Sequence, residues 1–252
     1  MCPTILTIGP LSVHGYGLMI GIGIAAALFV IWHRGDRMGF DSSRVNTVIL
    51  LVLVSGFAGA KLLYILAHWK TFAADPLGTL GSEGFVVYGG MICSISAAYL
   101  YCRRHDLPFL RWADGFMPGA VLAQGFGRIG CFLAGCCYGK ATDSIFGVVF
   151  PAVSSAPSGI PLWPTQLFSA LGDFLLAALL LLLDRKKHAQ GLLAGVYLLL
   201  YSVGRFLIEF LRDDPRGAVG VLSTSQFIAL FTFAASVVFL WFVIGKERKH
   251  GA

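Results

Sequence analysis

The chain has 252 residues, of which 57% are hydrophobic and 13% are charged, and its formal net charge at pH 7 is +6. Because soluble domains carry about 25% charged residues, this composition excludes an ordinary soluble enzyme and indicates a protein embedded in a membrane. The positive charge does not indicate nucleic-acid binding, because Lys and Arg gather at the ends of apolar runs and form no basic face interleaved with aromatic residues.

Apolar runs between charged or Pro/Gly-rich breaks predict seven membrane-spanning helices. A span requires roughly 20 apolar residues, so short connections take up the rest of the chain. In chain order, the predicted spans are 12–32, 45–66, 85–102, 115–134, 165–184, 191–209 and 226–244. We therefore expect an all-α, polytopic membrane protein that forms a single integral membrane domain over residues 1–252.

The distribution of Lys and Arg predicts how the chain is oriented. Three basic residues fall in each of four segments on one side, which makes twelve: 33–44, 103–111, 185–187 and 246–249. The connections on the opposite side carry four basic residues: one in 67–84, one in 135–164 and two in 210–225. Since cytoplasmic loops carry the excess of basic residues, we expect the N-terminus outside and the C-terminus in the cytoplasm. The long outer connection 135–164 is a candidate lid.

Several charged residues fall inside the predicted spans. Lys61 lies in the second span, Arg128 in the fourth, and Arg205 and Glu209 in the sixth. A charge at the centre of a bilayer costs about 2.5–3.5 kcal/mol, so such residues usually face the interior of the helix bundle and carry function. Arg205 and Glu209 are four residues apart, and Arg212 extends the same helix face by a further turn. We therefore expect an intramembrane site with alternating charges.

Two interpretations of these charges remain open. In the first, Glu209 only neutralises a neighbouring cation, and Arg212 extends its head group to the outer interface. Against it, the cations outnumber the carboxylate, which favours an anionic ligand. In a membrane this anion is a phospholipid phosphate, which Arg binds through paired hydrogen bonds.

The segment 125–139 surrounds Arg128 with five glycines. Such a run predicts a poor uniform helix, because glycine lets the backbone approach a ligand or break into a loop. Irregular backbone at membrane depth is tolerated where it lines a cavity. The alternative is a glycine-rich face that packs against other helices.

Three cysteines, Cys131, Cys136 and Cys137, follow Arg128 at the outer end of the fourth span. Three interpretations remain open: small buried residues, a disulfide formed in an oxidising compartment, or a reactive thiol made acidic by Arg128. We predict no metal ion and no cofactor, because no histidine lies nearby in the sequence to complete a zinc site.

Five segments of the chain are similar, in order and spacing, to motifs of a known family. They are His14–Leu18, Gly59–Tyr64, Gly127–Gly139, Pro164–Phe168 and Arg205–Arg212. On these segments the chain resembles the bacterial prolipoprotein diacylglyceryl transferases over nearly its whole length. The resemblance implies transfer of the diacylglyceryl group of phosphatidylglycerol to the lipobox cysteine of a preprolipoprotein, which forms a thioether and releases glycerol phosphate.

The resemblance also implies roles for individual residues. The implied catalytic residues are Arg128, Arg205, Glu209 and Tyr88. The implied substrate-binding residues are Arg128, Tyr16, Lys61, Gly89, Gly90, Gly139 and Arg212. The implied location is the bacterial cytoplasmic membrane, crossed several times, and the implied partners are phosphatidylglycerol and a lipobox-containing preprolipoprotein.

The chain departs from the family pattern at positions where the family has side chains that can transfer protons or donate hydrogen bonds. Tyr88 stands where the family usually has His, Cys131 and Ala134 replace two Asn residues, Cys136 replaces Glu, and Trp163 replaces a frequent His. A phenol holds its proton at neutral pH and is a poor base. Two other functions therefore remain open: a divergent relative with another acceptor or a cysteine-based chemistry, and a non-catalytic lipid-binding membrane protein.

Overall fold

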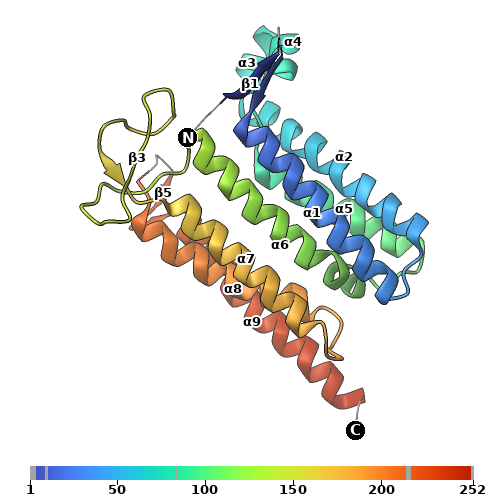
Figure 1. Cartoon of the computed structure of the whole chain (residues 1–252). Coiled ribbons are helices and arrows are strands. Elements are labelled where there is room, and N and C mark those ends of the chain that lie inside the picture. The colour runs from blue at the N-terminus through green and yellow to red at the C-terminus, as the bar shows by residue number, and fades with distance from the viewer. Residues whose placement is uncertain (1–3, 9–10, 83, 214–216, 251–252) are drawn as a thin grey trace. The chain divides into compact units, whose positions relative to one another are not determined.

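The computed structural model describes residues 4–8, 11–82, 84–213 and 217–250, which are mainly α-helical (Figure 1). The helices are α1 Gly15–Arg37, α2 Ser42–Ala67, α3 Trp69–Ala74, α4 Pro76–Gly81, α5 Val87–Arg104, α6 Phe109–Ala134, α7 Thr165–Leu183, α8 Leu192–Ile208, the 3-10 helix η1 Glu209–Leu211 and α9 Thr224–His250. Three antiparallel hairpins join β1 Thr4–Ile8 to β2 Leu11–His14, β3 Val148–Val149 to β4 Pro161–Leu162, and β5 Ala218–Val219 to β6 Leu222–Ser223.

Each predicted span coincides with a long helix, so the all-α polytopic fold is confirmed. Five helices within the described residues are long and apolar enough to cross a membrane: α1, α2, α7, α8 continued through η1, and α9. The other two predicted spans, α5 and α6, are more polar, because α5 ends on two arginines and α6 carries Arg111, Asp114 and Arg128. The number seven and the orientation stay predictions. Residues 214–216, part of one connection counted for the orientation, lie outside the described residues.

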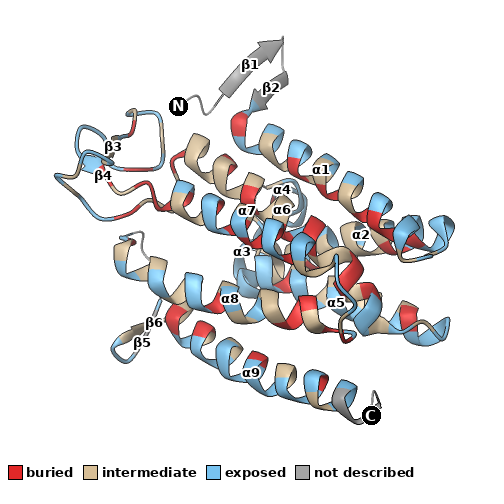
Figure 2. Cartoon of the chain, turned by 60° about the horizontal axis from the view of Figure 1, so that its bottom comes forward, coloured by how far each residue is buried: buried red, intermediate tan, exposed pale blue. Residues whose placement is uncertain are grey.

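Large apolar side chains remain exposed on the long helices. Figure 2 shows many exposed positions along α9, and these include Trp241 and Phe242, which are 71% and 62% exposed. A soluble protein rarely exposes such extended apolar surface, whereas a lipid-facing helix does so as a rule. The exposed faces therefore agree with a membrane environment.

The chain divides into two compact units, one of residues 1–31 with 113–252 and one of residues 32–112. In the second unit, α2 and α5 pack closely because glycines face each other. A Cβ atom added to Gly59 would lie 2.5 Å from the Cβ of Cys93, and one added to Gly90 would lie 2.8 Å from the carbonyl oxygen of Gly56.

In the first unit, α6 contacts three other helices. Gly119 of α6 lies against Ala27 of α1, Gly125 of α6 lies against Phe174 of α7, and Asp114 of α6 binds the start of α8. α7 lies beside α8, and α8 beside α9 (Figure 1). The buried core between α6, α7 and α8 consists of Val121, Leu176, Ala177, Leu180 and Leu193. Arg128, two turns beyond Val121 on α6, is therefore held by a packed helix.

Asp114 caps helix α8 from α6. Its side chain is buried, and its carboxylate accepts hydrogen bonds from the backbone N–H of Gly191 at 2.6 Å and of Ala194 at 3.0 Å. The first N–H groups of a helix have no partner inside the helix. The Asp114 carboxylate supplies that partner and ties the start of α8 to α6.

Replacing this cap is expected to destabilise the first unit. Asp114→Ala leaves two buried N–H groups without an acceptor, so we expect the free energy of unfolding to fall by about 2 kcal/mol. Thermal unfolding of the purified protein in detergent measures the change. Asp36→Ala, which removes an exposed carboxylate of α1, is the matched control. Equal unfolding temperatures for the two variants would contradict the capping role.

Candidate active site

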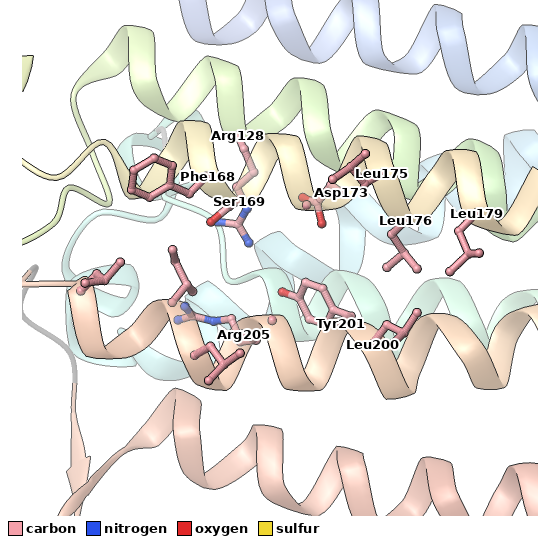
Figure 3. Close-up of a pocket in the computed structure, with 15 residues that line it drawn as sticks. Arg128, Phe168, Ser169, Asp173, Leu175, Leu176, Leu179, Leu200, Tyr201 and Arg205 are labelled. Carbon is pink, nitrogen blue, oxygen red and sulfur yellow. The ribbon is translucent and has the colours of Figure 1, made fainter. Parts of the chain in front are cut away.

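A cavity of about 590 Å³ lies in the first unit between α7 and α8, with one side chain contributed by α6 (Figure 3). Its polar lining residues are Arg128, Ser169, Asp173, Tyr201 and Arg205, and its apolar ones include Leu175, Leu176, Leu179 and Leu200. Figure 3 shows the two arginines near one end of the cavity and the four leucines toward the other. The cavity therefore has a cationic end and an apolar end, as an amphipathic anion requires.

Arg128 brings an unpaired guanidinium group to the cationic end. Within the described part of the chain, its side chain makes no ion pair and no hydrogen bond; Tyr201 and Asp173 act on it electrostatically. Taking a charge out of water is costly unless a partner replaces the water. A guanidinium in this position favours an anion that can accept its hydrogen bonds.

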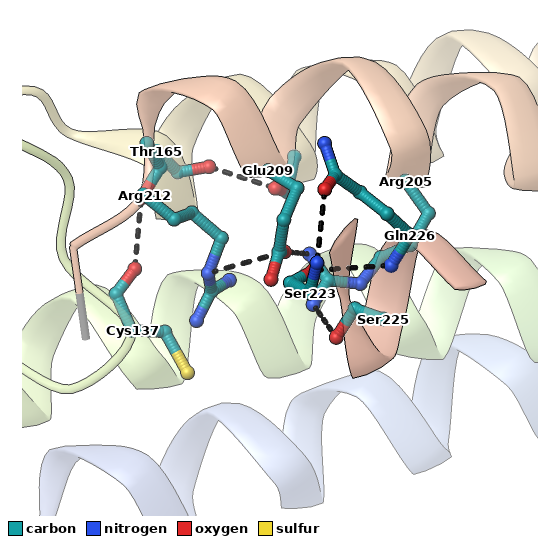
Figure 4. Close-up of polar contacts among 9 residues, drawn as sticks. Cys137, Thr165, Arg205, Glu209, Arg212, Ser223, Ser225 and Gln226 are labelled. Carbon is teal, nitrogen blue, oxygen red and sulfur yellow. Dashed lines mark hydrogen bonds and ion pairs between the residues drawn. The ribbon is translucent and has the colours of Figure 1, made fainter. Parts of the chain in front are cut away.

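Arg205, by contrast, is fixed by protein partners (Figure 4). One of its terminal nitrogens lies 2.7 Å from Oε2 of Glu209, and the other donates to Oγ of Ser225 at 2.7 Å. Nε of Arg212 lies 3.9 Å from the same Glu209 oxygen. All three charged side chains are almost buried, so one carboxylate orients two cations, as the spacing of the charges predicted.

The three cysteines predicted at the end of the fourth span lie close together. Their Sγ atoms are all within 4.8 Å of one another, and none of the three forms a disulfide within the described residues. Hydrogen bonds from the thiols of Cys131 and Cys136, and then from the guanidinium of Arg212, lower the pKa of Cys137 below its usual value. Hydrogen bonding to Cys131 and Cys137, together with burial, raises the pKa of Cys136.

The prediction that the run 125–139 makes a poor uniform helix was wrong for residues 125–134 and is confirmed for residues 135–139. α6 continues without a break through Gly125, Gly127 and Gly130 to Ala134. The reason is packing: a Cβ atom on Gly125 would lie 2.6 Å from the ring of Phe174, and one on Gly130 would lie 3.0 Å from the ring of Tyr16. The break comes only after Ala134, at the backbone turn that carries Cys136 and Cys137.

Two other predicted substrate-binding residues lie in the first unit. Tyr16 packs on Gly130, one residue from Cys131, and is half-exposed. Gly139 donates its N–H to the carbonyl of Trp163 at 3.0 Å, and a Cβ atom there would lie 2.7 Å from the carbonyl oxygen of Leu211. Gly139 therefore allows a close backbone contact next to Arg212. The substrate-binding roles of both residues stay predictions.

Lys61 belongs to the second unit and binds backbone there. Its Nζ donates to the carbonyl oxygens of Ser82 at 2.7 Å and Gly84 at 3.4 Å, and lies 5.0 Å from the ring centre of Phe85. This ammonium group fastens the segment that leads into α5. Its predicted role in substrate binding stays a prediction.

Tyr88, Gly89 and Gly90 also belong to the second unit, at the start of α5. Gly89 and Gly90 lie against the backbone of Gly59 and Gly56 in α2, where a larger residue would not fit. Tyr88 is 49% exposed. The two glycines thus have a packing role, and the catalytic or substrate-binding roles of all three residues stay predictions.

Sequence reasoning missed one buried carboxylate of the cavity. Asp173 of α7 accepts a hydrogen bond through Oδ1 from Nε2 of Gln124 at 2.7 Å, and Gln124 in turn accepts one from the hydroxyl of Tyr197 at 2.9 Å. Oδ2 of Asp173 is buried and has no hydrogen-bond partner among the described residues. The sequence contains the signal, because Asp173 is the only charged residue between 165 and 183 of an apolar run.

The connection 135–164 has a small core of its own. Phe150, Ala156 and Leu162 are buried together, and Phe132 of α6 packs against them. The β3–β4 hairpin lies within this segment. The connection is therefore an ordered cap over the end of α6, and its opening and closing as a lid stays a prediction.

The fold defines a class, a polytopic helical membrane protein with a cavity that is lined by arginines and leucines. The chain matches the family described as prolipoprotein diacylglyceryl transferase over residues 3–242. It therefore belongs to the prolipoprotein diacylglyceryl transferase family, a family of transferases, and the resemblance seen in the motifs is confirmed.

Similar proteins cover the chain almost completely. It is 45% identical over 242 residues to phosphatidylglycerol–prolipoprotein diacylglyceryl transferase 2 of Clostridium perfringens, a match covering 95% of this chain and 94% of the relative. It is 44% identical over 252 residues to phosphatidylglycerol–prolipoprotein diacylglyceryl transferase of Clostridium tetani, covering 99% and 100%. The protein of that name from Dehalococcoides mccartyi (strain ATCC BAA-2266) is 32% identical over 253 residues, covering 98% and 95%.

Proposed function

We propose that this protein transfers the diacylglyceryl group of phosphatidylglycerol to a cysteine thiol of a prolipoprotein. The observation that carries the proposal is the cavity, where the unpaired guanidinium of Arg128 stands at the opposite end from a group of leucines. A phospholipid has the same division, with a phosphate at one end and acyl chains at the other. The names of the relatives supply the donor and the class of acceptor.

In the proposed reaction the cavity binds the donor lipid. The acyl chains lie along Leu175, Leu176, Leu179 and Leu200, and the phosphodiester lies between Arg128 and Arg205. The acceptor thiol gives up its proton to water, and its sulfur attacks the carbon of the diacylglyceryl group that bears the phosphate oxygen. A carbon–sulfur bond forms, the carbon–oxygen bond breaks, and its electron pair leaves with glycerol phosphate. The phosphate gains a negative charge in this step, and the arginines stabilise that charge more in the transition state than in the bound lipid.

Glu209 acts as a positioning residue in this proposal. It lies 2.7 Å from the guanidinium of Arg205 and 3.9 Å from that of Arg212. Because the protein fixes Arg205 before the substrate arrives, little reorganisation is needed as charge develops on the leaving group. Without Glu209, the two cations would repel each other and move apart.

We further propose that the acceptor is the lipobox cysteine of a preprolipoprotein and that the reaction takes place at the outer face of the bacterial cytoplasmic membrane. The support is the predicted orientation, in which the ends of α6 and α8 that carry Arg128, Arg205 and Glu209 face outward. The neighbouring connection 135–164 would then lie outside the membrane, where an exported acceptor arrives.

A transfer assay tests the proposed function. Purified protein in detergent is mixed with phosphatidylglycerol labelled in its acyl chains and with a peptide that contains a lipobox cysteine. We expect a labelled thioether peptide and one free glycerol phosphate for each peptide modified. A peptide with serine in place of the cysteine is the control and should stay unmodified. Release of glycerol phosphate without a modified peptide would favour a relative with another acceptor, and no turnover of the lipid would refute transferase activity on this donor.

A further inference from the structure

The proposed reaction gives no role to three thiols that interact electrostatically with Arg128 or Arg212. Cys131 lies on the last turn of α6, and Cys136 and Cys137 lie in the turn that follows. Their three Sγ atoms are all within 4.8 Å of one another. A tetrahedral zinc ion with Zn–S bonds of about 2.3 Å holds its sulfurs about 3.8 Å apart. Small rotations of the cysteine side chains are enough to reach that geometry.

The turn that carries two of these thiols is built by the protein itself. Gly135 and Cys137 have φ angles of +74° and +63°, a conformation that reverses the chain directly after α6. The carbonyl of Cys136 accepts a hydrogen bond from Nε2 of Gln166 at 2.7 Å, and that of Cys137 accepts one from Oγ1 of Thr165 at 2.8 Å. Both donors are completely buried at the start of α7. The thiols are therefore presented by a fixed backbone.

The surroundings suit an anionic metal centre. A zinc ion with three thiolates carries a net charge of −1, and a fourth thiolate makes it −2. The guanidinium of Arg212 acts electrostatically on the thiol of Cys137, and that of Arg128 acts on Cys131 and Cys137. These two cations offset the charge of such a centre. The excess of cations over carboxylates in this region thereby gains a second explanation besides the lipid phosphate.

We propose that Cys131, Cys136 and Cys137 bind one Zn²⁺ ion as three thiolates and that its fourth position receives the thiol of the acceptor cysteine. Catalytic zinc sites have three protein ligands and one position for water or substrate, whereas structural sites have four protein ligands. This proposal rests on the proposed transfer to a cysteine thiol, because it assigns the zinc to that same acceptor.

The chemistry balances without a protein base. As the acceptor thiol binds, its S–H bond breaks, the proton leaves to water, and a Zn–S bond forms; a thiol that binds zinc is deprotonated outright. A lone pair of this sulfur then forms the carbon–sulfur bond, and the electron pair of the broken carbon–oxygen bond leaves with glycerol phosphate. One thiol and one phosphatidylglycerol thus give one thioether, one glycerol phosphate and one proton. The neutral thioether is a weak ligand and is replaced by water.

Cobalt substitution tests the metal site directly. The full-length protein is purified in detergent under reducing, oxygen-free conditions, stripped with a chelator and titrated with Co²⁺. We expect about one Co²⁺ per chain, with the thiolate-to-cobalt charge-transfer band and the strong visible bands of tetrahedral Co²⁺. Adding the lipobox cysteine peptide should change the visible bands, and the serine peptide should not. A spectrum that ignores both peptides would refute an open fourth position for the acceptor.

Serine variants assign the ligands. Cys131→Ser, Cys136→Ser and Cys137→Ser should each weaken Zn²⁺ binding by at least about 100-fold in competition with a chromophoric chelator. Cys93→Ser, which changes a partly buried cysteine of the other unit, is the matched control and should bind like the wild type. Failure of the reduced wild type to take up Zn²⁺ or Co²⁺, or equal binding by all the variants, would overturn the proposal.

Failure of this proposal can be told from failure of the proposed function. If metal-free protein forms the thioether at the full rate, the zinc is not part of the reaction and the transferase activity stands. In a second outcome, zinc binds and the peptide changes the cobalt spectrum, but phosphatidylglycerol gives no thioether. This outcome would support the metal site and refute phosphatidylglycerol as the donor. A rate that disappears with the chelator and returns with about one equivalent of Zn²⁺ supports both.

Discussion

Arg128→Lys is expected to lower kcat/KM for phosphatidylglycerol by about 100-fold or more. Within the described residues, the Arg128 guanidinium has no ion pair, so its full set of hydrogen bonds is available to the lipid phosphate. Lysine keeps the charge but replaces a planar fork by a compact ammonium group, which cannot hold two phosphate oxygens side by side. The loss should appear in kcat as well as in KM, because the charge grows during the reaction.

The control for this prediction is Arg44→Lys. Arg44 is exposed at the start of α2 and pairs only weakly with Asp41, at 4.0 Å. Its replacement should leave the rate of transfer and the unfolding temperature unchanged. If Arg128→Lys stays within about threefold of the wild type in the transfer assay, the guanidinium fork is not what binds the phosphate.

Glu209→Gln is expected to reduce kcat by about 10- to 100-fold without raising KM for phosphatidylglycerol. The amide keeps the shape of the side chain but removes the charge that holds Arg205 and Arg212 in place. The loss of one anion makes the site more positive, so an anionic lipid should still bind. What is lost is the fixed position of Arg205 as the leaving group gains charge.

The same variant should also be less stable than the wild type. Removing one partner from a buried ion pair leaves a buried charge uncompensated, which costs about 3–5 kcal/mol in other proteins. Glu247→Gln, at an exposed position of α9, is the control for both measurements. A rise in KM for the lipid with unchanged kcat would mean that Glu209 helps to bind the substrate rather than to position Arg205.

Much of the fold could be predicted from periodicity and charge alone. Every predicted span corresponds to a helix, because runs of about 20 apolar residues have few other stable conformations. The ion pair of Arg205 with Glu209 could also be predicted, since residues four apart share one face of a helix. In both cases the spacing of residues along the chain was sufficient to predict the structure.

The sequence did not predict contacts that depend on how distant segments pack. The sequence did not show that carbonyl oxygens some twenty residues later in the chain bind Lys61, whose role in substrate binding stays a prediction. Glycine propensity argued against a helix at 125–130, but aromatic rings from α1 and α7 fill the space beside Gly125 and Gly130. Tertiary packing overrode local preference at these positions.

The sequence singled out the three cysteines but not how closely their sulfur atoms approach, and it missed Asp173 altogether. The convergence of three thiols depends on the turn at Gly135 and on the buried donors of α7, and spacing alone does not show either. The prediction of no metal ion considered a zinc site with four ligands from the chain, whereas the proposed site takes three from the chain and one from the acceptor. Asp173, in contrast, could have been found by the rule that identified Arg128, because it is a charge inside an apolar span.

Photo-crosslinking of the donor lipid tests the central claim, that the cavity between α7 and α8 binds phosphatidylglycerol. The probe is phosphatidylglycerol with a photoreactive group in one acyl chain, and mass spectrometry locates the attached lipid. We expect labelled peptides around Leu175–Leu179 of α7 and Leu200 of α8, and much weaker labelling in Arg128→Ala. Labelling confined to α9 or to residues 32–112, or equal labelling in Arg128→Ala, would contradict the assignment of this cavity as the lipid site.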